Sequence, residues 1–224
     1  MGHWTTLDTP DGQVAAWHAT PASSPRGGLV VIQEIFGVNE HIRAVADDYA
    51  ARGYEVLAPA FFDLEEKDVQ LPYDQQSLQQ SLQRGLALAN AVGLERAVEV
   101  VKSAATLLTR AGKVGTVGYC WGGSVALLSA IRLGLPSVSY YGGRNTQLLD
   151  ETPKAPVMFH FGERDASIPP EAIQAHREKL PQMETFVYPA GHAFNRSIDP
   201  THYDADSAER ALERTLGFFA AHLG

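Results

Sequence analysis

Short apolar runs alternate with helix-like segments along most of this chain. Each run is long enough for a strand buried on both faces, and the runs cover residues 29–33, 54–57, 114–117, 138–141, 157–161 and 185–188. Apolar residues recur at helical spacing in segments 40–52, 73–91, 94–110, 124–133, 170–179 and 205–222. Strands that alternate with helices form right-handed crossovers between parallel strands. The pattern therefore predicts an α/β fold with a mostly parallel, doubly wound sheet flanked by helices.

The N-terminal region predicts an exception to the parallel order. Residues 13–18 form a short strand-like run after a Pro-Asp-Gly turn at 10–12, which favours an antiparallel edge hairpin. We predict one domain over residues 1–224, since a chain of this length can bury a single core. Segment 61–93 is a long excursion that can lie over a site as a cap. A solvated helix with one apolar stripe (Leu78, Leu82, Leu86) is an equally good reading.

Charge and composition exclude several function classes. The chain has 18 Lys and Arg against 26 Asp and Glu, a net charge of −8, so we expect neither nucleic acid nor an anionic membrane surface as a partner. No apolar stretch reaches the roughly eighteen residues that a membrane span needs. The single cysteine cannot form an internal disulfide, and residues 1–10 lack the layout of a secretory signal, which predicts a cytoplasmic protein.

The single cysteine, Cys120, lies in the sequence Gly-Tyr-Cys-Trp-Gly-Gly at 118–123, between an apolar run and a helix-like segment. A nucleophile between two glycines is typical of a sharp turn from strand to helix, where a Cβ on either flank would collide with neighbouring backbone. Such a turn exposes the side chain above the sheet. The alternative is a buried, inert cysteine that acts as a small hydrophobe.

A nucleophilic thiol needs a base and an acid that orients the base, and the chain offers both in loops after later runs. Asp165 follows the run ending at 161, and His192 follows the run ending at 188. Because the carboxyl ends of parallel strands share one edge of a sheet, we expect Cys120, Asp165 and His192 to converge there. Taken singly, Asp165 also fits a turn or helix cap, and His192 also fits a surface loop.

Four blocks carry a resemblance to a known family: QEIFGVN at 33–39, GYCWGG at 118–123, GERDASIP at 162–169 and GHAF at 191–194. With these blocks the chain resembles the dienelactone hydrolase (carboxymethylenebutenolidase-like) family of the α/β-hydrolase superfamily. The resemblance implies that Cys120 is the nucleophile, His192 the base and Asp165 its orienting acid. It also implies that Glu34 holds the resting thiol until substrate displaces the carboxylate. An ordinary loop carboxylate is the alternative for Glu34.

The same resemblance implies the groups that hold the substrate. The backbone N–H groups of Ile35 and Trp121 would form the oxyanion hole. Arg196 would bind a substrate carboxylate, and the alternative is a surface arginine paired with Asp199. Tyr141 would line the pocket or belong to the core.

The implied activity is hydrolysis of a carboxylic ester or lactone through a thioester, with no metal or organic cofactor. The implied substrate is a small molecule, and both neutral and anionic substrates remain open. A low-turnover ligand-binding module and a hydrolase of a different bond remain alternatives. One departure concerns the substrate: family members that hydrolyse dienelactone carry an arginine, a tyrosine and a tryptophan around 75–84, where this chain offers Gln75, Gln79, Leu82 and Arg84. Oligomeric state is not predicted.

Overall fold

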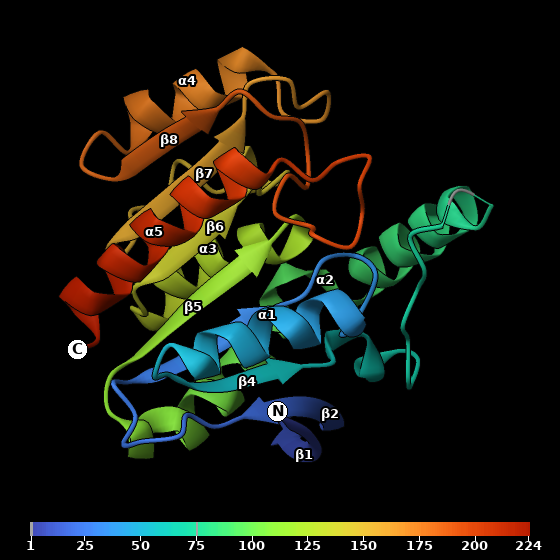
Figure 1. Cartoon of the computed structure of the whole chain (residues 1–224), viewed down its shortest axis with the longest axis vertical. Helices are drawn as coiled ribbons and strands as arrows, with labels where there is room; N and C mark the ends of the chain where they lie inside the picture. Colours follow the sequence, from blue (N-terminus) through green and yellow to red (C-terminus); the bar gives the residue numbers. More distant parts are fainter. Residues whose placement is uncertain (1, 75) are drawn as a thin grey trace.

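The computed structural model describes residues 2–74 and 76–224 and contains an eight-stranded sheet in the order β1-β2-β4-β3-β5-β6-β7-β8 (Figure 1). The strands are β1 (His3–Thr9), β2 (Gly12–Ala19), β3 (Gly28–Ile32), β4 (Glu55–Pro59), β5 (Val114–Tyr119), β6 (Ser137–Tyr140), β7 (Val157–Gly162) and β8 (Glu184–Tyr188). Strands β3 to β8 pair in parallel, whereas β1 and β2 form an antiparallel hairpin whose second strand pairs with β4. The predicted mostly parallel sheet with an antiparallel N-terminal edge is confirmed.

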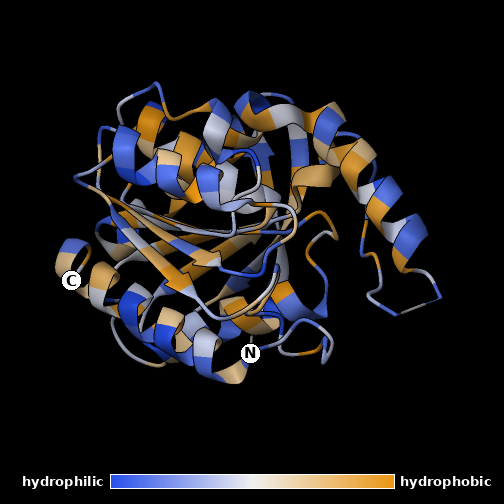
Figure 2. Cartoon of the chain, turned by 90° about the horizontal axis from the view of Figure 1, so that it is seen from above, coloured by the Kyte–Doolittle hydropathy of each residue, from blue (hydrophilic) through white to orange (hydrophobic). Residues whose placement is uncertain are grey.

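Helices cover both faces of this sheet (Figure 2). They are α1 (Glu40–Ala51), α2 (Leu78–Leu108), α3 (Trp121–Leu133), α4 (Pro170–Lys179) and α5 (Ala205–His222), with short 3-10 turns η1 (Phe61–Leu64), η2 (Thr109–Ala111) and η3 (Asn145–Gln147). Helix α2 packs against α3. Helices α1 and α5 meet through the rings of Tyr49 and Phe219, whose centroids lie 6.3 Å apart. None of the described helices is both long and apolar enough to cross a membrane.

The two helices predicted at 73–91 and 94–110 correspond to the two parts of helix α2. This helix runs from Leu78 to Leu108 and is broken at Gly93, whose φ of 71° leaves the helical region. Its start lies later than the predicted residue 73. The side chain of Asp74 accepts the backbone N–H of Ser77 in a turn, and the Tyr73 hydroxyl donates to Glu34, so this stretch is tied into a loop. Gln75 lies outside the described residues.

The burial of the central strands explains why they appear in the sequence as continuous apolar runs. Every residue of β3, β4, β5, β6 and β7 is buried. A strand with helices on both faces needs apolar residues on both sides, so it reads as a continuous apolar run. The loops that leave β3, β5, β7 and β8 at their carboxyl ends therefore come together at one edge of the sheet.

Candidate active site

Cys120 joins β5 to α3 at a strained turn. Its backbone has φ 56° and ψ −119°, which is unusual for a residue with a side chain. A Cβ on Gly118 would lie 1.9 Å from the carbonyl oxygen of Gly122, and a Cβ on Gly122 would lie 2.4 Å from that of Gln33. Both flanking glycines are therefore required by close backbone contacts, as the motif predicts.

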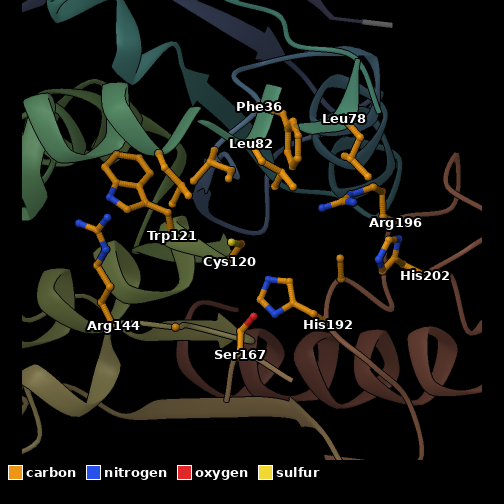
Figure 3. A pocket seen from close by; sticks show the side chains of 14 residues that line it. Phe36, Leu78, Leu82, Cys120, Trp121, Arg144, Ser167, His192, Arg196 and His202 are labelled. Atoms are coloured by element: carbon orange, nitrogen blue, oxygen red, sulfur yellow. The ribbon is translucent and has the colours of Figure 1, made fainter. Parts of the chain in front are cut away.

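His192 lies beside this turn and is oriented by Asp165. His192 Nδ1 and Asp165 Oδ2 are 2.6 Å apart, and the Asp165 side chain is fully buried. The backbone N–H of Ser167 donates to the other oxygen of Asp165 at 2.8 Å and fixes the carboxylate. Figure 3 shows the Cys120 sulfur and the His192 ring facing each other. The loops after β5, β7 and β8 thus bring the thiol, imidazole and carboxylate to one place.

The surroundings of His192 favour its charged form. Burial lowers the pKa of His192, but the negative charge of an ionised Cys120 and the hydrogen bond to Asp165 raise the pKa to about 10, from an ordinary value of 6.5. Once the Cys120 thiol has ionised, the imidazole therefore holds the proton. A thiolate is the reactive form of cysteine, so this geometry suits nucleophilic attack.

Ile35 and Trp121 both line the cavity at Cys120. Trp121 is the first residue of α3, where a backbone N–H has no acceptor within the helix. Ile35 follows β3, and its position is fixed by α2, because a Cβ on Gly85 would lie 2.0 Å from the Ile35 carbonyl oxygen. The Trp121 ring packs on Phe61, with centroids 5.7 Å apart. Both backbones are thus held firmly beside the sulfur.

Glu34 and Arg196 form a buried ion pair that the sequence did not predict. Arg196 donates from Nε and Nη2 to the two oxygens of Glu34, each at 3.0 Å, and the two side chains are 5% and 0% exposed. The Tyr73 hydroxyl donates to Glu34 Oε2 at 3.0 Å. Burial alone would raise the pKa of Glu34, but Arg196 lowers the pKa below its ordinary value. The Arg196 guanidinium also lies over the Tyr73 ring, 4.3 Å from its centroid.

Arg196 also forms the pairing with Asp199 that the sequence offered as the alternative. Arg196 Nη1 donates to Asp199 Oδ2 at 3.0 Å, and His202 Nδ1 lies 2.7 Å from the same oxygen. Arg196 is nevertheless buried rather than on the surface. Glu34 was expected at the thiol, but within the described residues its hydrogen bonds go to Arg196 and Tyr73.

The ring of Tyr141 packs against the imidazole of His192. Tyr141 is fully buried, its φ is 40°, and its ring centroid lies 5.0 Å from that of His192. Its hydroxyl finds no hydrogen-bond partner within residues 2–74 and 76–224. Tyr141 is in contact with His192 but is not among the residues that line the cavity.

A cavity of about 360 Å³ opens above Cys120 and His192. One wall is apolar and consists of Leu78, Leu82 and Leu86 of α2, so the apolar stripe of the 61–93 excursion faces the site. Arg144 and Arg196 supply its cationic side chains (Figure 3). Sequence reasoning missed Arg144, because no motif marks it. Among the described side chains, no group of three or more His, Cys, Asp or Glu is placed to hold a metal ion.

Comparisons with known proteins show the family to which the chain belongs. The model of the Dienelactone hydrolase family matches residues 14–223. A protein of Azospirillum brasilense named "Putative carboxymethylenebutenolidase" is 34% identical, with 96% of each chain covered. "Carboxymethylenebutenolidase" of Pseudomonas putida is 32% identical over 96% of this chain and 94% of its own.

Solved structures extend the similarity to the fold. The crystal structure of "Putative Dienelactone Hydrolase" from Klebsiella pneumoniae subsp. pneumoniae has a TM-score of 0.86 and 27% identity and covers 99% of both chains. A Xanthomonas campestris α/β serine hydrolase, 15% identical with a TM-score of 0.67 and coverage of 96% and 94%, shares the fold. The sheet and its flanking helices are those of an α/β-hydrolase, and the chain belongs to the dienelactone hydrolase family.

Proposed function

We propose that this protein hydrolyses a carboxylic ester or lactone, with Cys120 as the nucleophile, His192 as the base and Asp165 as the acid that orients it. The observation that carries the proposal is the Asp165–His192 hydrogen bond at 2.6 Å beside a cysteine held on a strand-to-helix turn. Names of relatives support it, since the Pseudomonas putida protein is a carboxymethylenebutenolidase.

The reaction would proceed in two halves. His192 first takes the proton of the Cys120 thiol, and the thiolate attacks the carbonyl carbon while the backbone N–H groups of Ile35 and Trp121 stabilise the oxyanion. The carbon–oxygen bond then breaks, and His192 gives its proton to the departing alkoxide, which leaves a thioester on Cys120. His192 next takes a proton from water, the hydroxide attacks the thioester, and the thiolate departs as the acid is released. In a lactone the alkoxide stays attached to the acid.

Glu34 is proposed to hold the thiol of the resting enzyme and to give it up when substrate enters. Its pairing with Arg196 and Tyr73 supports this role, because these groups can receive the carboxylate once it has left the thiol. A thiol that ionises only in the presence of substrate would be protected from oxidation. Tyr141 is proposed to support the His192 ring by packing against it.

The test uses the fact that Cys120 is the single cysteine of the chain. Alkylation with iodoacetamide, and separately Cys120→Ala, should abolish hydrolysis of an activated aryl ester while circular dichroism shows an intact fold. Mass spectrometry of the enzyme quenched during turnover should show an acyl adduct on Cys120. Full activity after complete alkylation would refute the mechanism. An unmodified enzyme without esterase or lactonase activity would instead favour the ligand-binding alternative.

A further inference from the structure

The cavity contains two arginines whose charges are balanced very differently. Arg196 faces two carboxylates, Glu34 and Asp199, with three of its nitrogens occupied by them at 3.0 Å. Its positive charge is therefore more than compensated locally. A substrate anion brought to Arg196 would meet two negative neighbours, and like charges at this range repel strongly in a partly buried site.

Arg144 has no such compensation. Its Nη2 donates to the neutral side-chain oxygen of Asn90 on α2 at 2.6 Å, and no carboxylate of the described residues lies within ion-pair distance. The other donors of its planar fork remain available for a ligand. On a chain with a net charge of −8, this guanidinium is a local positive site at the cavity.

The loop that carries Arg144 is built rigidly. The backbone N–H of Arg144 donates to Ser124 Oγ of α3 at 3.0 Å, and the buried side chain of Asn145 donates to Ser139 Oγ at 3.2 Å. A Cβ on Gly142 would lie 2.3 Å from the side-chain oxygen of Asn145, so the loop packs without slack. These contacts fix the backbone of the loop, and the bond to Asn90 restrains the guanidinium, which lowers the entropy cost of binding an anion.

The position of Arg144 relative to the nucleophile defines a substrate shape. In Figure 3 Arg144 lies at the Trp121 end of the cavity, with Arg196 at the opposite end and Cys120 between them. The leucine wall of α2 (Leu78, Leu82, Leu86) also borders this space. A molecule that reaches from Cys120 toward Arg144 thus passes apolar side chains before it meets a cation.

We propose that Arg144 determines substrate specificity by binding an anionic group of the substrate at the Trp121 end of the cavity. This inference rests on the proposed hydrolase function and names a specificity-determining residue for that site. It assigns anion recognition to Arg144, whereas the sequence predicts Arg196 for that role.

The experiment compares matched neutral and anionic esters. One pair places the carboxylate on the acyl side: the para-nitrophenyl monoester of glutaric acid against para-nitrophenyl pentanoate. The other pair places it on the alcohol side: the acetyl ester of meta-hydroxybenzoic acid against phenyl acetate. The variant is Arg144→Gln, which removes the charge and keeps a polar side chain. Arg177→Gln, at an exposed position of α4, makes the same change in net charge away from the cavity.

Arg144→Gln should lower the anionic-to-neutral ratio of kcat/KM by about tenfold or more in at least one pair, because a charge-assisted hydrogen bond is lost. Arg177→Gln should leave both ratios as in the unmodified enzyme. Ratios that stay within about twofold in Arg144→Gln would overturn the inference.

Binding measurements keep the two proposals separate. Calorimetric titration uses the hydrolysis-resistant amides of the same four molecules. If the unmodified enzyme hydrolyses none of the esters, the proposed function fails, and the amides still decide the role of Arg144. Weaker binding of an anionic amide to Arg144→Gln, with unchanged binding to Arg177→Gln, supports anion recognition. Equal binding of the anionic amides to all three proteins overturns it.

Discussion

Replacing Arg196 by methionine tests the energetics of the buried ion pair beside the nucleophile. Methionine keeps much of the side-chain volume but removes the guanidinium that bonds Glu34 at two points. Asp199 keeps a partner in His202, at 2.7 Å. Glu34 is the group left without a cation in contact, since Tyr73 offers it a neutral hydroxyl.

The expected loss follows from the burial of the pair. The Glu34 side chain is 0% exposed, and removing one partner of a buried pair costs about 3–5 kcal/mol of unfolding free energy. For a chain of this size that loss lowers Tm by roughly 6–20 °C. Arg132→Met is the matched control, because Arg132 also binds two carboxylates, Glu95 and Glu151, but at the surface. It should cost about 1 kcal/mol or less.

The pH dependence has a definite sign. In the unmodified protein Arg196 lowers the pKa of Glu34 below 4.5, so this carboxylate contributes stability above pH 4.5 that is lost as the pH falls. In Arg196→Met, burial still raises the pKa of Glu34, but the guanidinium that lowered this pKa is gone. Glu34 then takes up a proton more readily on folding, and the deficit relative to the unmodified protein should shrink as the pH falls from about 8 to about 5.

Denaturation by guanidinium chloride, followed by circular dichroism, gives the unfolding free energies of both single variants and of the double variant Glu34→Gln/Arg196→Met. The double variant should recover a large part of the unfolding free energy lost in Arg196→Met, because the neutral amide of Gln at position 34 leaves no charge buried. A loss for Arg196→Met no larger than that for Arg132→Met would refute the reasoning. So would a double variant no more stable than Arg196→Met at neutral pH.

Two further predictions follow from the turn at Cys120 and from its base. Gly118→Ala should destabilise the protein severely, because the new Cβ would lie 1.9 Å from a backbone oxygen, whereas Gly217→Ala within α5 has open space and should add about 0.5–1 kcal/mol in the same denaturation assay. NMR titration should show the pKa of His192 above its ordinary value of 6.5, and Cys120→Ala should lower that pKa, because the negative charge of an ionised Cys120 helps to raise it. His192 should therefore stabilise the fold fully below its ordinary pKa of 6.5 and lose this contribution as the pH rises through about 10. An unchanged His192 pKa in Cys120→Ala would contradict this account.

The sequence alone determined the sheet, most helices and the meeting of Cys120, Asp165 and His192. Strands buried on both faces must be apolar throughout, so they are visible as runs. The glycines around Cys120 are visible because the backbone leaves no room for a Cβ. The convergence of the three side chains followed from the rule that carboxyl ends of parallel strands share one edge.

Only the tertiary structure decided which charges pair and which stay free. Glu34 and Arg196 are separated by 162 residues, and no local pattern marks their contact. The late start of α2 likewise depends on Tyr73 reaching Glu34. Arg144 matters because its neighbour on α2 is the neutral Asn90 and not a carboxylate. A buried or half-buried charge is defined by the surfaces that fold around it, and those surfaces come from segments far apart in the chain.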